Sequence, residues 1–310
     1  MNEPRLILGI GELLWDEFPE RALLGGAPAN FTVMAGRLGN HAAILSRIGR
    51  DELGKRAIAT LDPLPADTGR VQIDPAHETG RVTVTLKDGQ GEYRFHEPSA
   101  WDFLELTDEW VQLAERADAI CFGSLAQRAL VSRQTIQTLV AETSSVCSRV
   151  FDVNLRPPFY SAETLQESLE LATVVKMNDA ELPVILGSLG LPAEDEPTAS
   201  RLRAGAGRLL AEFPNVQMVA ITRGANGSLL VKRDECHDHP GIATPVADTI
   251  GAGDAFTAAM THYLLRGASL PVLNEAGNRW GSWMASQAGA MPVLPGAVRD
   301  RITAAVTGLA

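Results

Sequence analysis

Short apolar runs alternate with longer stretches of helical period from about residue 117 onward. The short runs are rich in β-branched residues, which favours strands, and the stretches between them carry apolar residues at helical spacing. This alternation is typical of strand and helix units around a mostly parallel sheet. The predicted strands are 119–124, 150–154 and 173–177, and the predicted helices are 132–143, 162–171, 254–266, about 271–287 and 297–309.

The amino-terminal part begins in the same way and then changes character. A strand is predicted at 6–10, a helix at 29–38 and a strand at 42–48. Strand patterning follows at 71–73, 81–86 and 92–96, with a hairpin turn at Asp88-Gly89. Because such a meander does not thread easily through a parallel core, we interpret it as a small β-rich lid. We expect one α/β domain over 1–310, with the lid formed by segments of about 11–24 and 69–102.

Composition and charge narrow the possible partners. The chain has 310 residues, 45% of them hydrophobic, and a formal net charge of −11. An acidic chain without clustered basic residues disfavours nucleic acid as a partner, which leaves small molecules. The sequence has no 18-residue apolar stretch and no pattern of a secretory signal, so no membrane association is expected. The three cysteines, Cys121, Cys147 and Cys236, are an odd number without paired spacing, so no disulfide framework is expected. This fits a protein of the reducing cytoplasm.

The most informative segment runs from Asp248 to Phe256 and reads D-T-I-G-A-G-D-A-F. Two glycines stand directly before a helical stretch, where free backbone N–H groups and the positive end of the helix dipole can hold a phosphate. Asp254 in the first turn could accept the proton of a hydroxyl that attacks a phosphoryl group. The spacing alone leaves a second interpretation equally open, in which Asp254 only caps the helix and Gly251 and Gly253 form an ordinary loop.

This segment resembles the carboxy-terminal signature of the ribokinase-like carbohydrate kinases, also called the phosphofructokinase B family. The resemblance extends to the glycine pair in residues 25–30, to the Gly-Arg-Leu-Gly run at 36–39 and to residues 49–54, so it covers nearly the whole chain. It implies a three-layer sandwich with a mostly parallel central sheet and a small lid. It also implies that Asp254 is the catalytic base, and that the amides of Gly251, Ala252 and Gly253 stabilise the phosphoryl group in transfer.

On the substrate side, Gly25 and Gly26 let the backbone approach a ligand closely, and Asn30 offers both a donor and an acceptor. Read without the family, these residues are a loop and a helix cap. The resemblance implies that they line a sugar pocket together with Asp16.

Other candidates for the substrate side follow the strand at 150–154 and the predicted lid. The segment 152–156 resembles the D-x-N-x-R run of fructokinase-like members, so Asn154 and Arg156 are expected to face substrate or phosphate. Arg156 could instead be a surface side chain. Trp101 could stack on a sugar face or belong to the core. The run 93–102 departs from the Y-R-x-x-G-A-D pattern of many members, which leaves the identity of the sugar open.

On the nucleotide side, the resemblance implies a T-x-G-x-x-G element and an N-x-x-E element. The first corresponds to Thr222, Gly224 and Gly227, which face ATP, and the second to Asn178 and Glu181, with Glu181 organising Mg²⁺ through water. Glu181 could also be a capping residue.

Two further assignments on this side follow from the resemblance alone. Asn278 corresponds loosely to a position near adenine. Asp248 and the carbonyl of Ile250 correspond to ligands of a monovalent cation, K⁺.

The resemblance therefore implies a kinase that transfers the γ-phosphate of ATP to a sugar hydroxyl, with the fructokinase-like subgroup favoured. Within the same enzyme class, a 2-keto-3-deoxygluconate kinase, whose substrate carboxylate Arg156 would meet, and a nucleoside kinase are alternatives. A sugar-sensing regulatory protein with a kinase fold is the alternative outside enzymes. A homodimer through the lid is implied by family members whose lid strands pair between subunits.

Overall fold

The computed structural model describes residues 3–87, 90–192 and 198–309. The predicted turn at Asp88-Gly89 lies outside the described residues. In the described part of the chain, no helix combines the length and the apolar character that crossing a membrane requires.

The centre of the molecule is an eight-stranded sheet with the order β14-β13-β12-β11-β10-β9-β1-β4. Its strands are parallel except β13, which runs antiparallel to both of its neighbours. Parallel strands joined through helices bring all their carboxyl ends to one edge of the sheet. The strands are β1 (Leu6–Ile10), β4 (His41–Leu45), β9 (Ala119–Phe122), β10 (Ser148–Asp152), β11 (Val174–Asn178), β12 (Met218–Thr222), β13 (Ser228–Val231) and β14 (Cys236–His239).

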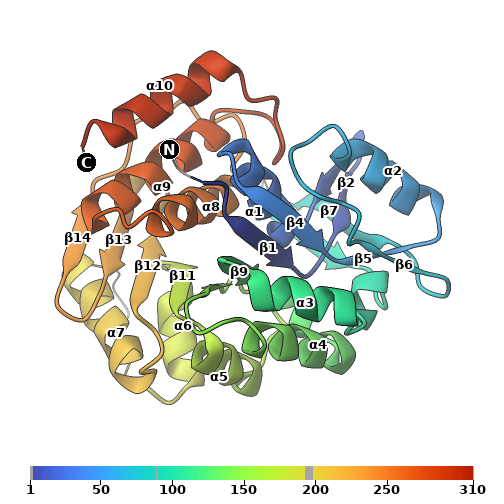
Figure 1. The fold of residues 1–310 in the computed structure, drawn as a ribbon, viewed down its shortest axis with the longest axis horizontal. Coiled ribbons are helices and arrows are strands. Elements are labelled where there is room, and N and C mark those ends of the chain that lie inside the picture. Colours follow the sequence, from blue (N-terminus) through green and yellow to red (C-terminus); the bar gives the residue numbers. More distant parts are fainter. Residues whose placement is uncertain (1–2, 88–89, 193–197, 310) are drawn as a thin grey trace.

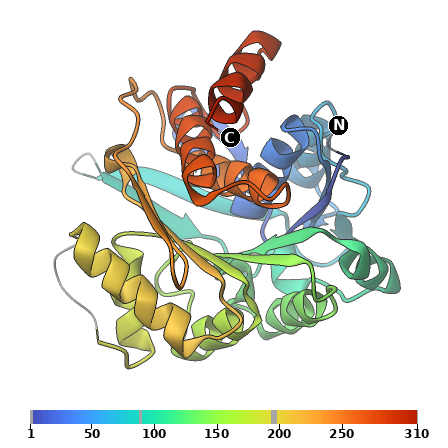
Figure 2. The ribbon, with the colours of Figure 1, turned by 60° about the vertical axis from the view of Figure 1, so that its left-hand side comes forward.

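Helices cover both faces of this sheet, as Figures 1 and 2 show. Because the strands are buried on both sides, successive residues enter different cores: Leu8 and Ile10 belong to one and Ile7 to the other. The first face carries α3 (Asp108–Arg116), α4 (Leu130–Ala141), α5 (Ala162–Leu171), α6 (Glu181–Ser188) and α7 (Ala199–Glu212). The second carries α1 (Ala27–Arg37), α8 (Ala252–Leu264) and α9 (Leu270–Ala285), with α10 (Gly296–Thr307) against α9.

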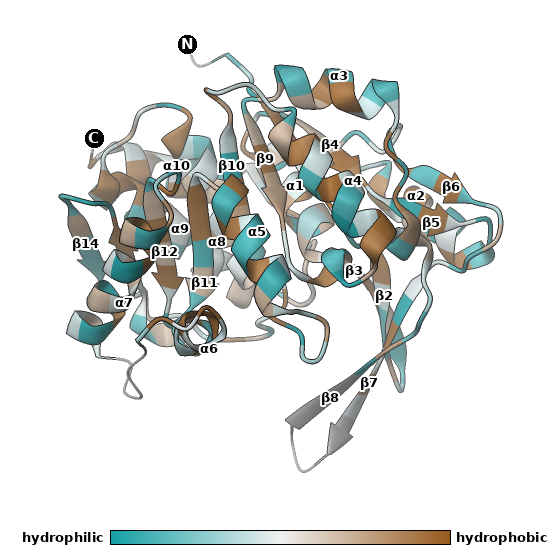
Figure 3. Cartoon of the chain, turned by 90° about the horizontal axis from the view of Figure 1, so that it is seen from below, coloured by the Kyte–Doolittle hydropathy of each residue, from teal (hydrophilic) through white to brown (hydrophobic). Residues whose placement is uncertain are grey.

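Figure 3 shows the consequence of this layering in the hydropathy of the chain. The central strands are hydrophobic, whereas the helices alternate between hydrophobic and hydrophilic residues. The predicted α/β class with a mostly parallel central sheet is confirmed.

A second, four-stranded sheet of order β3-β2-β7-β8 lies beside the carboxyl end of β1. It consists of β2 (Leu14–Phe18), β3 (Arg21–Gly25), β7 (Gly80–Lys87) and β8 (Gln90–Phe95). Leu13, Trp15 and Leu24 attach it to α1 through a separate apolar cluster, which also contains Ala57 and Leu61 of α2 (Glu52–Leu61). These strands come from the segments in which the sequence predicts a lid.

The prediction of a single strand at 42–48 was wrong. The chain leaves the central sheet at Ser46, whose hydroxyl donates to the carbonyl of Gly11 (2.7 Å). Strand β5 (Arg47–Gly49) then pairs with β6 (Gln72–Asp74) in a separate two-stranded sheet. The buried Arg47 of β5 forms ion pairs with Asp74 of β6 (2.9 Å) and with Glu105 (2.6 Å), and a buried guanidinium needs such partners.

Candidate active site

Most of the predicted site residues come together at the carboxyl edge of the central sheet. The loops after β1, β10 and β11 and the amino terminus of α8 meet there, with the lid strands β2 and β3 beside them. This edge is where ligands bind in open parallel sheets.

Asp254 lies in the first turn of α8 and is held from α1. The side-chain amide of Asn30 donates to Asp254 Oδ2 at 2.7 Å, across 224 residues of sequence. Burial raises the pKa of Asp254 to about 6, and the charge of Asp152 adds to this effect, whereas the Asn30 hydrogen bond and the charges of Lys176 and Arg156 oppose it. A carboxyl group with this pKa is ionised at neutral pH and is a stronger base than an exposed aspartate.

The backbone before Asp254 has the form of an anion site. Gly251 is the residue before α8, with φ at 77° in the left-handed region, and a Cβ there would lie 2.9 Å from the Cβ of Ala290. Glycine is therefore required on both conformational and steric grounds. The first amides of α8 have no partner within the helix and carry the positive end of its dipole. The N–H of Ala252 donates to the carbonyl of Thr249 at 3.2 Å in this structure, and the N–H of Gly253 follows it in the same turn, next to the base.

The lid supplies Asp16 and the glycine pair. Asp16 Oδ2 lies 2.8 Å from where a Cβ on Gly25 would stand, and a Cβ on Gly26 (φ 113°) would meet the carbonyl of Glu12 at 2.3 Å. Burial raises the pKa of Asp16 to about 6, with Arg156 lowering it and Asp248 raising it. The lid carboxylate is thus within electrostatic reach of groups on the main body.

Two residues after β10 border the same region. Asn154 has φ at 44°, and its carbonyl accepts from the Ser124 hydroxyl at 3.4 Å. Arg156 is exposed, and its charge lowers the pKa of Glu12, Asp16 and Asp254 alike. The charge of Arg156 therefore acts on all three acidic side chains, while its guanidinium donates to the carbonyl of Leu155 at 3.1 Å.

Glu12 is a site residue that the sequence prediction missed. It follows β1, is buried, and accepts from the amide of Ala27 at 3.2 Å. Burial raises its pKa to about 7. Among the described residues, its second oxygen and Asn30 Oδ1 are buried without a hydrogen-bond partner; Asn30 also binds Asp254, whose charge raises the pKa of Glu12. Buried acceptors of this kind suit a ligand that brings hydroxyl groups. An acidic residue two positions after the end of an apolar strand was the available signal.

An ion pair beneath the start of α8 was also missed. Lys176 Nζ donates to Asp152 Oδ1 at 3.0 Å, and both side chains are buried. The other oxygen of Asp152 accepts from the Thr257 hydroxyl of α8 at 2.8 Å. The sequence signal was a lysine among the apolar residues of 174–177, because a charged residue in a fully buried strand needs a partner.

On the nucleotide side, the ends of β11 and β12 are joined. The amide of Asp179 donates to the carbonyl of Thr222 at 2.9 Å, so Asn178 and Thr222 lie on adjacent strand ends. Gly224 (φ 56°) and Gly227 (φ 78°) form the following turn, whose amide at Arg223 donates to the carbonyl of Gly227. The residues predicted to face ATP therefore lie next to one another at the ends of these two strands.

Glu181 and Asn178 form a reciprocal cap at the start of α6. Glu181 Oε2 accepts from the amide of Asn178 (2.8 Å), Asn178 Oδ1 accepts from the amide of Glu181 (2.9 Å), and Glu181 Oε1 accepts from the amide of Leu155 (2.7 Å). Each carboxylate oxygen keeps a free lone pair, so the residue can also hold the water shell of a hydrated cation. Capping and cation binding are both compatible with this geometry.

The donor set of the predicted monovalent site consists of oxygens. Asp248 Oδ1 accepts from the amide of Ile250 (3.1 Å), and Asp248 Oδ2 accepts from the amide of Gly289 (3.2 Å). These two hydrogen bonds hold the loop around the Asp248 carboxylate. Within the described ranges, no three His, Cys, Asp or Glu side chains gather into a metal cluster. The residues fit a cation that shares its shell with water and phosphate.

Two predicted site residues have core positions instead. Trp101 is 1% exposed, and the guanidinium of Arg128 lies over its ring at 3.9 Å. This arrangement offers no free ring face to a sugar, so the core interpretation of Trp101 holds in this structure. Asn278 is buried, and its amide nitrogen contacts Ser228 and Asn274, which fastens α9 to β13. Its observed bonds are structural.

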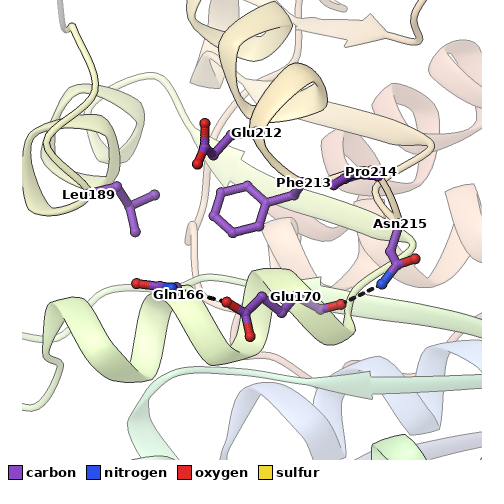
Figure 4. A pocket seen from close by; sticks show the side chains of 7 residues that line it. All are labelled: Gln166, Glu170, Leu189, Glu212, Phe213, Pro214 and Asn215. Carbon is purple, nitrogen blue, oxygen red and sulfur yellow. Dashed lines mark hydrogen bonds between the residues drawn. The ribbon is translucent and has the colours of Figure 1, made fainter.

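A separate hollow of about 200 Å³ lies at the opposite edge of the sheet. Figure 4 shows that residues of α5 and of the segment after α7 line it, with the carbonyl of Glu170 accepting from Asn215 (2.8 Å) and its carboxylate accepting from Gln166 (3.0 Å). Asn215 precedes β12, so this hollow is at the amino ends of the strands, away from Asp254. We assign no function to it.

Comparison with known proteins gives consistent matches along the chain. The profile of the pfkB family carbohydrate kinases matches residues 21–296. The fructokinase of Escherichia coli is 31% identical over 316 residues, which cover 92% of this chain and 95% of the relative.

Solved structures agree with the sequence matches. Fructokinase from Vibrio cholerae O395 with fructose, ADP and calcium ion has a TM-score of 0.82 at 26% identity, covering 96% of this chain and 99% of that one. The double mutant of that fructokinase, with fructose, ADP and potassium ion bound, has a TM-score of 0.81 at 25% sequence identity. The match covers 97% of this chain and 99% of that one. An uncharacterized sugar kinase from Pyrococcus horikoshii in complex with ATP has a TM-score of 0.78 at 28% sequence identity. The match covers 92% of this chain and 94% of that one. The predicted ribokinase-like fold is confirmed.

Proposed function

The chain belongs to the pfkB family of carbohydrate kinases and is a sugar kinase, and from this premise we propose that its acceptor substrate is fructose. The similarity to fructokinases over more than nine-tenths of the chain supports this choice. Asp16, Asn30 and the backbone at Gly25-Gly26 supply the mixed donors and acceptors that a polyol needs. Asn154 and Arg156 border the same region.

We assign the base to Asp254. The observation that carries this proposal is the Asn30–Asp254 hydrogen bond of 2.7 Å at the first turn of a helix that begins at left-handed Gly251. Asn30 orients the carboxylate, so that the free oxygen can accept the proton of the attacking hydroxyl. The amides of Gly251, Ala252 and Gly253 lie beside it, where they can face the negative charge of the transferred group. Position and charge compensation are what phosphoryl transfer requires from a protein.

We further propose which residues face the cofactors. The sugar kinase uses ATP and a metal ion, as the bound states of its structural relatives support. Asn178, Thr222, Gly224 and Gly227 face the nucleotide, Glu181 holds the water shell of Mg²⁺, and Asp248 with the Ile250 carbonyl takes up K⁺. The oxygen-only donor sets support hard cations. The adenine-side role of Asn278, the homodimer through the lid and the cytoplasmic location stay predictions.

The test is ADP release from Mg·ATP over a panel of acceptors, namely fructose, ribose, 2-keto-3-deoxygluconate and adenosine, with and without K⁺. We expect fructose to give the highest kcat/KM. A preference for 2-keto-3-deoxygluconate that Arg156→Met abolishes would replace fructose by an acid sugar, because the substrate carboxylate would then pair with Arg156. A preference for adenosine would replace it by a nucleoside.

Turnover of none of the acceptors would contradict the proposal. Isothermal titration with fructose would then decide whether the protein is a sugar sensor. In that case, binding without turnover would be expected.

A further inference from the structure

The buried pair Asp152–Lys176 connects three elements directly beneath the proposed phosphoryl-transfer site. Asp152 ends β10, Lys176 lies in the adjacent β11, and the Thr257 hydroxyl of α8 donates to the second oxygen of Asp152. The same hydroxyl lies 3.0 Å from the carbonyl of Gly253. One carboxylate thus joins two strands to the first turn of the helix that carries Asp254.

Lys176 also contacts this turn directly. A Cβ on Gly253 would lie 2.9 Å from Lys176 Nζ, so the ammonium group rests against the backbone of the anion site. Burying an ammonium and a carboxylate costs several kcal/mol per ion unless they pair and find further hydrogen bonds, and apolar residues of similar volume would pack there at no such cost. A pure packing role therefore does not account for these two residue types at this place.

We propose that Asp152 and Lys176 act as a positioning pair, which fixes the first turn of α8 and balances the charge around Asp254. This inference rests on the proposed role of Asp254 as the base. The two members act on Asp254 with opposite sign, because one is an anion and the other a cation close to the same carboxyl group. The opposite charges of Asp152 and Lys176 therefore leave Asp254 ionised, and the ammonium group of Lys176 places a fixed positive charge next to the anion site.

The titration behaviour of the surrounding groups agrees with this geometry. Burial lowers the pKa of Lys176, but the charges of Asp152, Glu181 and Asp254 outweigh it and hold that pKa above its ordinary value. Lys176 is therefore charged throughout the working range of the enzyme. Asn30 from α1 contacts Asp254, and the charged groups that act on it are Asp152 from β10, Lys176 from β11, Arg156 from the loop after β10 and Glu12 from the loop after β1.

The experiment compares the pH dependence of kcat/KM for the best acceptor in wild type, Asp152→Asn, Lys176→Met and the double variant. Asp152→Asn removes an anion, so the acidic limb should move to lower pH. Lys176→Met removes a cation, so the limb should move to higher pH. A nearby charge shifts a pKa by about one unit or more, which is a tenfold change in rate on the limb. The double variant is neutral, and its limb should return towards that of wild type.

The readouts separate positioning from mere stability. A loss of packing would lower kcat or the midpoint of thermal unfolding in both single variants, but it would not shift the acidic limb of the pH profile of kcat/KM in opposite directions. Unmoved limbs, or limbs that move the same way, would overturn the inference. If Lys176→Met does not fold, the limb of Asp152→Asn decides alone, with a downward shift supporting the pair and an unmoved limb refuting it. The failure of the base assignment is distinct, because Asp254→Asn would then remain active.

Discussion

At the scale of single residues, the site depends on a few long-range hydrogen bonds between side chains that are distant in sequence. Asn30 and Asp254 are 224 positions apart, and their contact orients one oxygen of the carboxylate and leaves the other available. Burial at the same time raises the pKa of Asp254 to about 6, which makes it a stronger base that is still ionised near neutrality. Orientation and basicity therefore come from the same environment.

Asp254→Asn should abolish turnover while leaving both ligands bound. The asparagine carbonyl can still accept from Asn30, so the geometry is kept, but the group no longer takes up a proton. A positioned base contributes about a thousand-fold, so kcat should fall by about that factor. Steady-state kinetics and calorimetric titration of ATP measure the two effects. Asp300→Asn on α10 is the control, and a variant that keeps a tenth of the wild-type rate would refute the assignment of the base.

Glu181→Gln distinguishes cation binding from capping. If the carboxylate holds the water shell of Mg²⁺, the Mg²⁺ concentration for half-maximal rate should rise about tenfold or more, because second-shell partners of a metal typically contribute that much to affinity. The glutamine would also lose one of the two acceptors for the amides of Leu155 and Asn178, which lowers the thermal midpoint. A lower midpoint with an unchanged Mg²⁺ requirement would assign Glu181 to the cap alone.

At the scale of elements, the sequence predicted the parts that follow from periodicity and from local glycine patterns. Strand β1 and helix α5 were placed at their observed bounds, and the turn before α8 was recognised because its signature is contiguous. The Asp152–Lys176 pair and Glu12 were missed, since their function depends on which strands become neighbours. Trp101 was ambiguous for the same reason: only the fold shows that Arg128 covers its ring.

Gly251→Ala should displace the start of α8. The left-handed φ of 77° costs an L-residue about 1–2 kcal/mol, and the new methyl group would stand 2.9 Å from Ala290 Cβ. The amides of the first turn and Asp254 would then shift, so kcat should fall by a factor of about 100. Gly190→Ala is the matched control, because its φ is also positive (67°) and its surroundings are open.

Both glycine variants should lose stability from backbone strain, measured as the midpoint of thermal unfolding, and Gly251→Ala should lose more because its methyl group also meets Ala290. Only Gly251→Ala should lose activity in addition. Equal kcat values for both variants would show that the start of α8 does not position the anion site.

At the scale of the whole molecule, the lid and the main body together bury acidic groups around one point. Glu12, Asp16 and Asp254 come from three different elements, and burial raises the pKa of each. The charge of Arg156 lowers the pKa of all three groups, and the ammonium group of Lys176 packs against the first turn of α8. In a chain with net charge −11, these cations and the amides of α8 are the local features that favour an anionic nucleotide. The cost of the buried acids is a stability that depends on pH.

Glu12→Gln should therefore stabilise the protein at pH 8. The pKa of Glu12 rises from 4.5 in the unfolded chain to about 7 in the folded one, so the folded state favours the protonated form. The contribution of this group to stability is fully present below pH 4.5 and is lost as the pH rises through 7. Glutamine resembles the protonated form at every pH and can still accept from the amide of Ala27.

The free energy of unfolding of the Glu12→Gln variant should therefore exceed that of wild type by an amount on the order of 3 kcal/mol at pH 8, and by much less at pH 5. Urea unfolding at both pH values measures this difference, with exposed Glu20→Gln as the control; a variant that is less stable at pH 8 would mean that the ionised carboxylate holds the lid to α1.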